Sequence, residues 1–376
     1  MSATSEYTIK VPIVPREPAT VPVTFHNFTV PSPTLDQYPA PSSTIPISGY
    51  PSAVAASADG ARVYVASRST TSNQPGTVSV VDSAAQGVVA TVAAGRTPSS
   101  VAVSADGTRA YVGNMGDRSV TVVDTTTNTH IATIQNAFST LLGPGGLAVS
   151  PDGSRVYATA APTSAGRVAT IDTTTNKVLD NISIGRSTTG VALSSDGAQL
   201  YVSNSDGTLA VIETATKNVA ATVALTYAYT IASYYDNVNI PSRQVPAQDI
   251  TVQDPTKGLV VSPDGKTAYV STDGGPTFVV DLTANKISTV LSLPFSLIPD
   301  VSYPQAIAIS PDGKTVYAPN TIYLDIVNTA SFATTQKAVQ DPLHGTQLAV
   351  SPDGKALYVA GYTKADGGYL EVVALT

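Results

Sequence analysis

Histidine is the residue type most often used as a general base near neutral pH, and the sequence contains three: His26, His130 and His344. The sequence contains no His-x-x-x-His pair, no Gly-x-Ser-x-Gly nucleophile turn and no phosphate-binding glycine loop. The segment Gly185-Arg-Ser-Thr-Thr-Gly190 has the wrong spacing for either of the last two motifs. Of the three histidines, only His344 is expected on the variable rim described below. It is therefore the one histidine that is a candidate for a general base, although a lone loop histidine is more often simply solvated.

Aspartates are the other residues that could carry chemistry, and seven of them recur in one motif, Ser-(Pro/Ala/Ser)-Asp-Gly. The seven copies are Ser57–Gly60, Ser104–Gly107, Ser150–Gly153, Ser194–Gly197, Ser262–Gly265, Ser310–Gly313 and Ser351–Gly354. Asp and Gly are the residues that a tight turn requires, so we interpret these aspartates as structural. A second set, Asp82, Asp124, Asp172 and Asp281, ends apolar runs and precedes Thr/Asn-rich turns. These aspartates are expected to accept hydrogen bonds from the turns that follow them.

A metal site would have to use oxygen ligands, because the chain has no cysteine. Aspartate and backbone oxygens around a central channel would suit Ca²⁺ or Mg²⁺. The acids available for such a site are Asp117, Asp206, Asp273 and Asp341. No spacing rule selects them, so no metal ligand and no cofactor is assigned.

Charge and composition exclude several classes of partner. The formal net charge is −7, whereas nucleic-acid binding requires a basic surface. No apolar run is long enough for a membrane helix, and the N-terminus lacks the pattern of a secretory signal. With only 12% charged residues, the composition favours a secreted or cell-surface protein, with a cytoplasmic location as the alternative.

The elements that must position any site follow from the repeats. Each Asp-Gly turn joins two alternating apolar runs, which predicts a β-hairpin. In the second repeat a third run, Val120-Thr-Val-Val-Asp124, and a fourth after the Thr/Asn turn complete the unit. Four antiparallel strands repeated seven times predict an all-β, seven-bladed β-propeller.

Ring closure and the extra segments are also predicted. The last repeat lacks its fourth strand, and the segment Ser43–Ile47 is expected to pair with Leu370–Ala374 to complete the last blade. Residues 43–376 would thus form the propeller, preceded by a Pro-rich extension of residues 1–42. This extension is either an arm along a blade or a flexible leader. A long interval between the fourth and fifth turns places an insert at about residues 227–257.

The repeat resembles the YVTN family of β-propeller repeats. Ala110-Tyr-Val-Gly-Asn114, Asp124-Thr-Thr-Thr-Asn128 and Asp172-Thr-Thr-Thr-Asn176 are close matches, and the resemblance covers residues 44–375. It implies the propeller fold and favours an exported or surface binding module. Related propellers include lactonases and lyases, so the resemblance is specific for fold and not for activity.

The Asp-Gly and Thr/Asn turns share one rim of the ring, which we term the bottom rim. The opposite top rim contains the links between blades and the loops between second and third strands, which differ in every repeat and can encode recognition. The residues expected to contact a ligand there are Arg96, Asn114, Arg118, Arg186, Asn204, Tyr227, Tyr229, Tyr234, Tyr235, Asp273, Tyr303, Asn320 and His344.

Two features of this set suggest specific arrangements. Arg96 and Arg186 follow a glycine at the same link position of two blades, and converging arginines bind carboxylate or phosphate; solvated arginines are the alternative. The tyrosines of the insert form either a lid over the channel or a β-extension that packs on its own blade.

These observations favour a non-catalytic binding propeller, monomeric, that recognises a protein or glycan through its top rim. The alternative is a propeller lyase or lactonase with a divalent metal at the channel mouth and His344 or an aspartate as acid/base.

Overall fold

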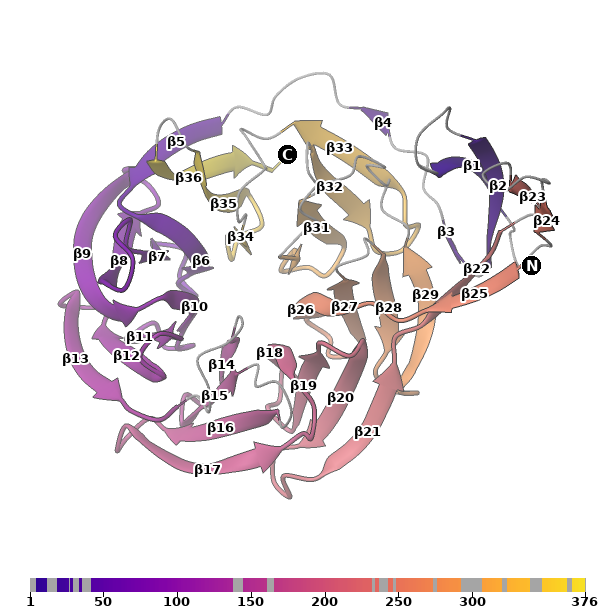
Figure 1. Ribbon diagram of the computed structural model, residues 1–376. Coiled ribbons are helices and arrows are strands. Elements are labelled where there is room, and N and C mark those ends of the chain that lie inside the picture. Colours follow the sequence, from indigo (N-terminus) through magenta and orange to yellow (C-terminus); the bar gives the residue numbers. More distant parts are fainter. Residues whose placement is uncertain are drawn as a thin grey trace.

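The computed structural model describes residues 5–11, 19–26, 28–29, 34–35, 42–137, 145–160, 166–231, 234–236, 243–245, 248–272, 276–291, 306–319, 323–338, 347–363 and 367–375. Seven four-stranded antiparallel blades form a ring around a central axis (Figure 1). The described residues contain strands and turns and no helix. The predicted seven-bladed β-propeller is therefore confirmed.

Each blade is a meander that runs from the central axis outwards. Blade 1 comprises β6 (Tyr50–Ala56), β7 (Arg62–Arg68), β8 (Pro75–Asp82) and β9 (Gly87–Arg96). Blade 2 comprises β10 (Pro98–Val103), β11 (Arg109–Asn114), β12 (Ser119–Asp124) and β13 (Thr129–Ile134). Blade 3 comprises β14 (Leu147–Val149), β15 (Arg155–Ala160), β16 (Arg167–Asp172) and β17 (Lys177–Ser183). Blade 4 comprises β18 (Thr188–Leu193), β19 (Gln199–Asn204), β20 (Thr208–Glu213) and β21 (Val219–Ala224).

The remaining blades follow the same order. Blade 5 comprises β26 (Thr256–Val261), β27 (Thr267–Thr272), β28 (Thr277–Asp281) and β29 (Lys286–Leu291). Blade 6 comprises β30 (Ala308–Ile309), β31 (Thr315–Pro319), β32 (Tyr323–Asn328) and β33 (Thr334–Ala338). Blade 7 comprises β34 (Gln347–Val350), β35 (Ala356–Thr363) and β36 (Gly367–Ala374), completed by β5 (Ser42–Ile47).

The core lies between blades. Seven hydrophobic clusters are present, and each joins the facing surfaces of two neighbouring blades. On a third strand such as β12, Val120 and Val122 face blade 3, whereas Val123 faces blade 1. The two-residue alternation of the sequence thus supplies two apolar faces per blade, which is why a single blade would leave apolar surface exposed.

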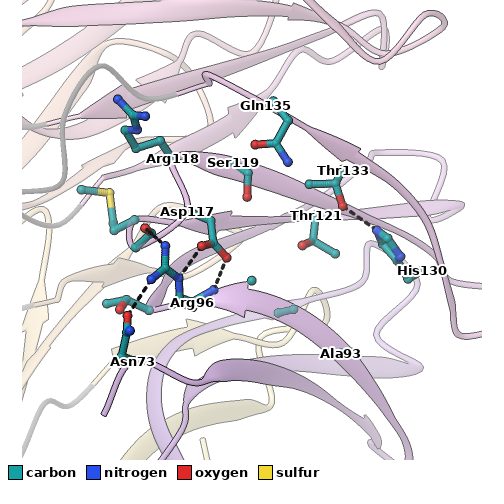
Figure 2. Close-up of a pocket in the computed structure, with 15 residues that line it drawn as sticks. Asn73, Ala93, Arg96, Asp117, Arg118, Ser119, Thr121, His130, Thr133 and Gln135 are labelled. Atoms are coloured by element: carbon teal, nitrogen blue, oxygen red, sulfur yellow. Dashed lines mark hydrogen bonds and ion pairs between the residues drawn. The ribbon is translucent and has the colours of Figure 1, made fainter.

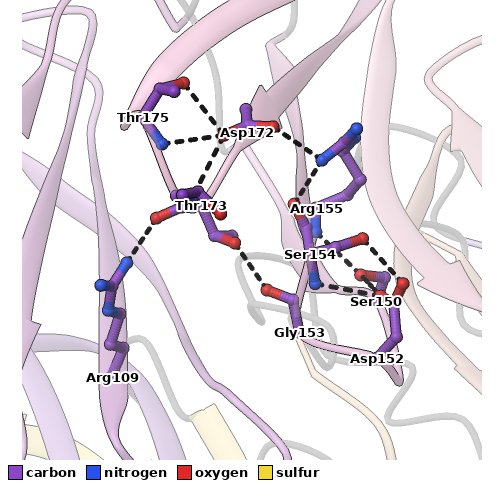
Figure 3. Close-up of polar contacts among 10 residues, drawn as sticks. Arg109, Ser150, Asp152, Gly153, Ser154, Arg155, Asp172, Thr173 and Thr175 are labelled. Carbon is purple, nitrogen blue, oxygen red and sulfur yellow. Dashed lines mark hydrogen bonds and ion pairs between the residues drawn. The ribbon is translucent and has the colours of Figure 1, made fainter.

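The bottom rim is held by the repeated turns, as blade 3 shows (Figure 3). Ser150 Oγ donates to Asp152 Oδ1 at 2.5 Å, and the Ser154 amide donates to the same oxygen at 3.0 Å. Gly153 has a φ of 70°, a conformation that glycine adopts without strain. The hydroxyl of Thr173 donates to the Gly153 carbonyl at 2.7 Å and ties the two turns of the blade together.

The aspartates at the ends of third strands have the expected structural role. Asp172 Oδ1 accepts hydrogen bonds from the amides of Thr174 and Thr175, and Asp82, Asp124 and Asp281 accept two equivalent amides each. Both families of aspartates are therefore used within their own turns.

The N-terminal strand closes the ring as predicted. β5 pairs antiparallel with β36, with Leu370 opposite Ile45 and Gly368 opposite Ile47. Ile45 and Ile47 are buried in the cluster that joins blade 7 to blade 1. One closed ring is therefore built from both ends of the chain.

The segment ahead of β5 follows the outer edges of two further blades. β3 (Phe28–Thr29) pairs parallel with β29 of blade 5, and β4 (Thr34–Leu35) pairs parallel with β33 of blade 6. Of the two expectations for residues 1–42, these pairings support the arm along blade edges.

The insert between blades 4 and 5 pairs with the N-terminus. β22 (Tyr227–Ile231) and β25 (Gln248–Val252) join β1 (Ser5–Val11) and β2 (Ala19–His26) in one four-stranded sheet, and β23 (Tyr234–Asp236) pairs with β24 (Arg243–Val245). Figure 1 shows these strands outside the ring, away from the central axis. The described part of the insert is thus a β-extension, and the expectation of a lid over the channel is not supported.

Candidate functional site

A groove of about 810 Å³ lies between blades 1 and 2 at the top of the ring. One wall is the end of β9, from Ala93 to Arg96; the other is the outer half of blade 2, from β12 and β13 (Figure 2). The volume falls within the range of about 300–1,000 Å³ that is typical of small-molecule sites.

The floor of the groove is polar because two strands alternate in the same sense. Ser119 and Thr121 of β12 face the groove, and the alternating Val120 and Val122 face blade 3. Thr121 lies directly opposite Thr133 on β13, and Gln135 follows two residues later on the same face. Four side chains able to form hydrogen bonds are thereby presented side by side (Figure 2).

The groove exists because the residues on both walls are small. The position three residues before the terminal aspartate of the third strand is Thr121 in blade 2 and Phe278 in blade 5. Phe278 is fully buried and packs against blade 4, where it fills the corresponding space. Opposite Thr121, blade 1 offers only Ala94, so the space stays open.

The buried side chain of Asn114 forms hydrogen bonds with two floor residues and with the neighbouring wall. Its side chain is 0% exposed; Oδ1 accepts the Gly95 amide at 3.0 Å, and Nδ2 donates to Thr121 Oγ1 at 2.9 Å and to Ser119 Oγ at 3.3 Å. Because both hydroxyls accept from this amide, their own hydrogens are left to donate elsewhere. Neither donates to another described residue. Asn114 therefore supports the groove without lining it.

Arg96 is fixed by an ion pair across the blade boundary. Its Nε donates to Asp117 Oδ1 at 2.6 Å, its backbone amide donates to Asp117 Oδ2 at 2.6 Å, and Nη1 donates to Asn73 Oδ1 at 2.6 Å. Burial raises the pKa of Asp117, but the Arg96 amide and guanidinium outweigh it and hold the pKa below its ordinary value. The two charges neutralise each other at the groove wall.

Arg118 has a different environment. It lies at one end of the groove, opposite the end that holds His130 (Figure 2). Its side chain is exposed and makes no hydrogen bond or ion pair with any residue that the structure describes. His130 Nε2 is 2.8 Å from Thr133 Oγ1. With Arg96 and Asp117 paired, Arg118 supplies the unbalanced charge of the groove, and that charge is positive.

Arg186 repeats the Arg96 arrangement at the boundary of blades 3 and 4. It forms an ion pair with Asp206, which precedes β20 by two residues, just as Asp117 precedes β12 by two. The two link arginines are therefore paired within separate blade boundaries and do not converge on one ligand. Asn204 is 0% exposed, donates through Nδ2 to Thr208 Oγ1 at 3.0 Å, and occupies the structural position of Asn114.

The insert tyrosine whose side chain is described packs on its own blade. The ring centroid of Tyr227 is 6.3 Å from that of Phe278, and its hydroxyl donates to Asp254 Oδ2 at 3.0 Å. Tyr229, Tyr234 and Tyr235 lie on β22 and β23, and their side chains are outside the described residues.

The other expected contact residues, Asp273, Tyr303, Asn320 and His344, also lie outside the described residues. The acid/base and metal hypotheses that depend on them therefore stay predictions. Within the described residues, no three acidic, histidine or cysteine side chains come together at one point. No helix there is long and apolar enough to cross a bilayer.

Sequence reasoning placed Arg96, Asn114 and Arg118 on one rim, and the structure brings them to one groove. It missed Asn73, Ser119, Thr121, His130, Thr133 and Gln135. The signal was the paired alternation Ser119-Val-Thr121 and Thr133-Ile-Gln135, in which polar side chains share one face of two paired strands.

Comparison with known proteins shows the fold alone. No protein-family model matches the chain, and no curated protein matches it in sequence. Among solved structures it is similar to Kuenenia stuttgartiensis hydrazine synthase, with a TM-score of 0.66 and 19% identity over 87% of this chain and 96% of that one. It is also similar to the β-propeller domain of Myceliophteria thermophila Cps50 (Swd1), with a TM-score of 0.64 and 15% identity over 89% of this chain and 100% of that domain. Both likenesses support a seven-bladed β-propeller, a fold that serves as a general scaffold for binding and interaction.

Proposed function

We propose that this chain is a non-catalytic binding propeller that engages a protein or glycan through its top rim, with the groove between blades 1 and 2 as the contact site. The observation that carries the proposal is the groove itself: a space of about 810 Å³ with a hydrogen-bonding floor and one unpaired cation. A few well-placed polar groups in a largely preformed space are what a specific binding site requires.

The surrounding structure supports binding rather than chemistry at this place. Asp117 is held by Arg96, and the hydroxyls of Ser119 and Thr121 are hydrogen-bonded to the Asn114 amide and not to a base. A nucleophile needs an adjacent base to be activated, and among the groove residues only Thr133 has one, with His130 Nε2 at 2.8 Å from its hydroxyl. The floor beside Arg118 therefore offers recognition groups, fixed before a ligand arrives.

The resemblance of the repeats to the YVTN family supports a secreted or cell-surface location, as part of the same proposal. A fractionation experiment in the source cells, with antibody detection of the untagged protein, tests this location. Recovery in the cytoplasmic fraction alone would overturn it.

Binding arrays test the proposed site directly. The wild-type chain is applied to a glycan array and a peptide array together with Ala94→Trp, which places a large ring in the groove from a half-buried position that faces blade 2. Ala93→Trp is the matched control, because Ala93 is the exposed neighbour on the same strand, pairs with Thr77 and faces away from blade 2. We expect Ala94→Trp to abolish binding and Ala93→Trp to preserve it. Binding that survives Ala94→Trp would place the contact elsewhere on the propeller.

A further inference from the structure

The ligand class can be narrowed from the backbone at Arg118. Arg118 has a φ of 54°, in the left-handed region that non-glycine residues seldom adopt. The corresponding residue of blade 4, which also stands immediately before the third strand, is Gly207, with a φ of 73°. Blade 2 therefore has an arginine at the position where the equivalent loop of blade 4 has a glycine, the residue that adopts a positive φ without strain. Strain of this kind is found where a side chain is needed for function.

The backbone of Arg118 has a defined place beside the groove. Arg118 is fixed through its backbone, because its amide donates to the Met115 carbonyl at 3.3 Å and its carbonyl accepts the Ala137 amide at 3.0 Å. The side chain stands at the end of the polar floor with no protein partner among the described residues. A free guanidinium fork matches the two oxygens of a carboxylate.

The polar residues of the groove floor indicate which chemical groups the rest of the ligand has. Ser119 and Thr121 have hydroxyl hydrogens to donate, and Gln135 can both donate and accept. These groups suit a ligand with several hydroxyls. Ala94 forms a small apolar wall against which the C–H face of a sugar ring can lie.

A peptide is a poorer fit. Peptide and protein contacts depend on large aromatic or aliphatic anchors that enter apolar pockets, and the groove walls are polar or small. A phosphate is also disfavoured, because Arg96 is neutralised by Asp117 and only one cation is free to meet it.

We propose that the groove binds a polyhydroxylated carboxylate, that is a sugar acid, with the carboxylate on Arg118 and the hydroxyls on Ser119, Thr121 and Gln135. This inference rests on the proposed binding function and deepens it. The sugar acid can be free or can be a unit of an acidic glycan, and the volume of the groove leaves room for more than one ring.

Calorimetric titration distinguishes a free sugar acid from an acidic glycan as the ligand. The probes are galacturonic acid, an oligogalacturonate, the neutral galactose oligomer of the same length, and an oligoglutamate peptide. We expect an acidic sugar to bind about tenfold or more tightly than the neutral oligomer, as a charge-assisted hydrogen-bond pair implies. Equal affinity for monomer and oligomer would indicate the free acid, and preference for the oligomer would indicate the glycan.

Two variants test whether Arg118 binds the carboxylate. Arg118→Gln keeps a side chain that this backbone accepts, since Gln86 has a φ of 50°. Arg167→Gln, which removes an exposed arginine of blade 3, is the matched control. We expect Arg118→Gln to weaken acidic-sugar binding about tenfold or more while the control changes it less than about twofold.

Failure of the sugar-acid assignment can be distinguished from failure of the proposed binding function. Preference for the oligoglutamate peptide, equal affinity for neutral and acidic sugars, or an Arg118→Gln variant with full affinity would overturn the sugar-acid assignment. If an array ligand of another class is still lost in Ala94→Trp, the groove remains a binding site and only its ligand class is wrong. If no probe binds and Ala94→Trp loses nothing, both proposals fail.

Discussion

Arg118 and Gly207 stand at the same place in two blades, each just before a third strand, and both have positive φ angles, 54° and 73°. Yet their neighbours differ. A Cβ on Gly207 would come within 2.5 Å of the Gln253 side chain and 2.8 Å of the Asp254 carbonyl, whereas blade 2 leaves room for a long side chain at the groove mouth. The loop with an open groove beside it is the one that carries the arginine.

Replacing Arg118 with glycine should therefore make the protein more stable. Relief of the left-handed conformation is worth about 1–2 kcal/mol, and the added freedom of the unfolded chain offsets about 0.4–1 kcal/mol of it. We expect Arg118→Gly to raise the free energy of unfolding by about 0.5–1 kcal/mol, measured by urea denaturation, while ligand binding is lost. A clear loss of stability would show that Arg118 has a structural contact of its own.

The ion pair between Arg96 and Asp117 should couple blades 1 and 2 more strongly than Arg186 and Asp206 couple blades 3 and 4. The exposed fractions are 39% and 30% for the first pair and 51% and 34% for the second. Both pairs are partly solvated, so solvent screening limits each coupling to about 1 kcal/mol or less. Double-mutant cycles with alanine, read by urea denaturation, measure the two couplings. A larger coupling for the blade 3–4 pair would contradict this order.

Acid should weaken the turns of the bottom rim. The Ser150 hydroxyl, followed by the amide and hydroxyl of Ser154, lowers the pKa of Asp152 from 3.8 to about 2, and the pKa values of the other six turn aspartates are lowered in the same direction. A group with a depressed folded pKa contributes stability above its unfolded pKa and loses it as the pH falls through the folded one. The melting temperature should thus fall between about pH 4 and pH 2.

The variant Asp152→Asn tests the contribution of one turn. It should melt below the wild type at neutral pH, and the difference should narrow as the pH approaches 2. A difference that stays constant over this range would mean that the titration of Asp152 is not linked to folding.

Two N-terminal truncations should behave differently. Removing residues 1–41 keeps β5 and should leave a folded ring whose outer strands β29 and β33 lose their parallel partners, so that light scattering rises on concentration. Removing residues 1–48 also removes Ile45 and Ile47, whose burial contributes about 3–6 kcal/mol together. Circular dichroism should show a much lower melting temperature for the second truncation. Equal melting temperatures would mean that β5 does not close the ring.

Chelation should leave binding unchanged if the groove acts as proposed, because its recognition groups are side-chain hydroxyls, an amide and a guanidinium. Elemental analysis of protein purified without chelator, followed by titration before and after treatment with EDTA, makes the measurement. A stoichiometric divalent ion whose removal abolishes activity would instead support the lyase or lactonase alternative, and mutation of His344 would follow.

The sequence by itself determined the repeat unit and the number of blades. A Ser-x-Asp-Gly turn between alternating apolar runs is a local signal, because turn geometry and strand alternation depend on residues close together in the chain. Closure by residues 43–47 was predictable for a related reason. The last repeat lacked its fourth strand, and residues 43–47 aligned with the fourth strand of another repeat.

The tertiary structure alone decided which residues meet across blade boundaries. Arg96 and Arg186 looked alike in sequence and were candidates for one anion site, but each pairs with an aspartate of the next blade. The sequence was equally compatible with an insert that forms a lid or a β-extension. In the structure the insert pairs with the N-terminal hairpin, and this pairing directs it away from the ring. The groove is the clearest case. It arises because Ala94 and Thr121, on different blades, are both small, whereas Phe278 fills the boundary between blades 4 and 5. Such a space depends on how two distant segments pack, which no local pattern of residues records.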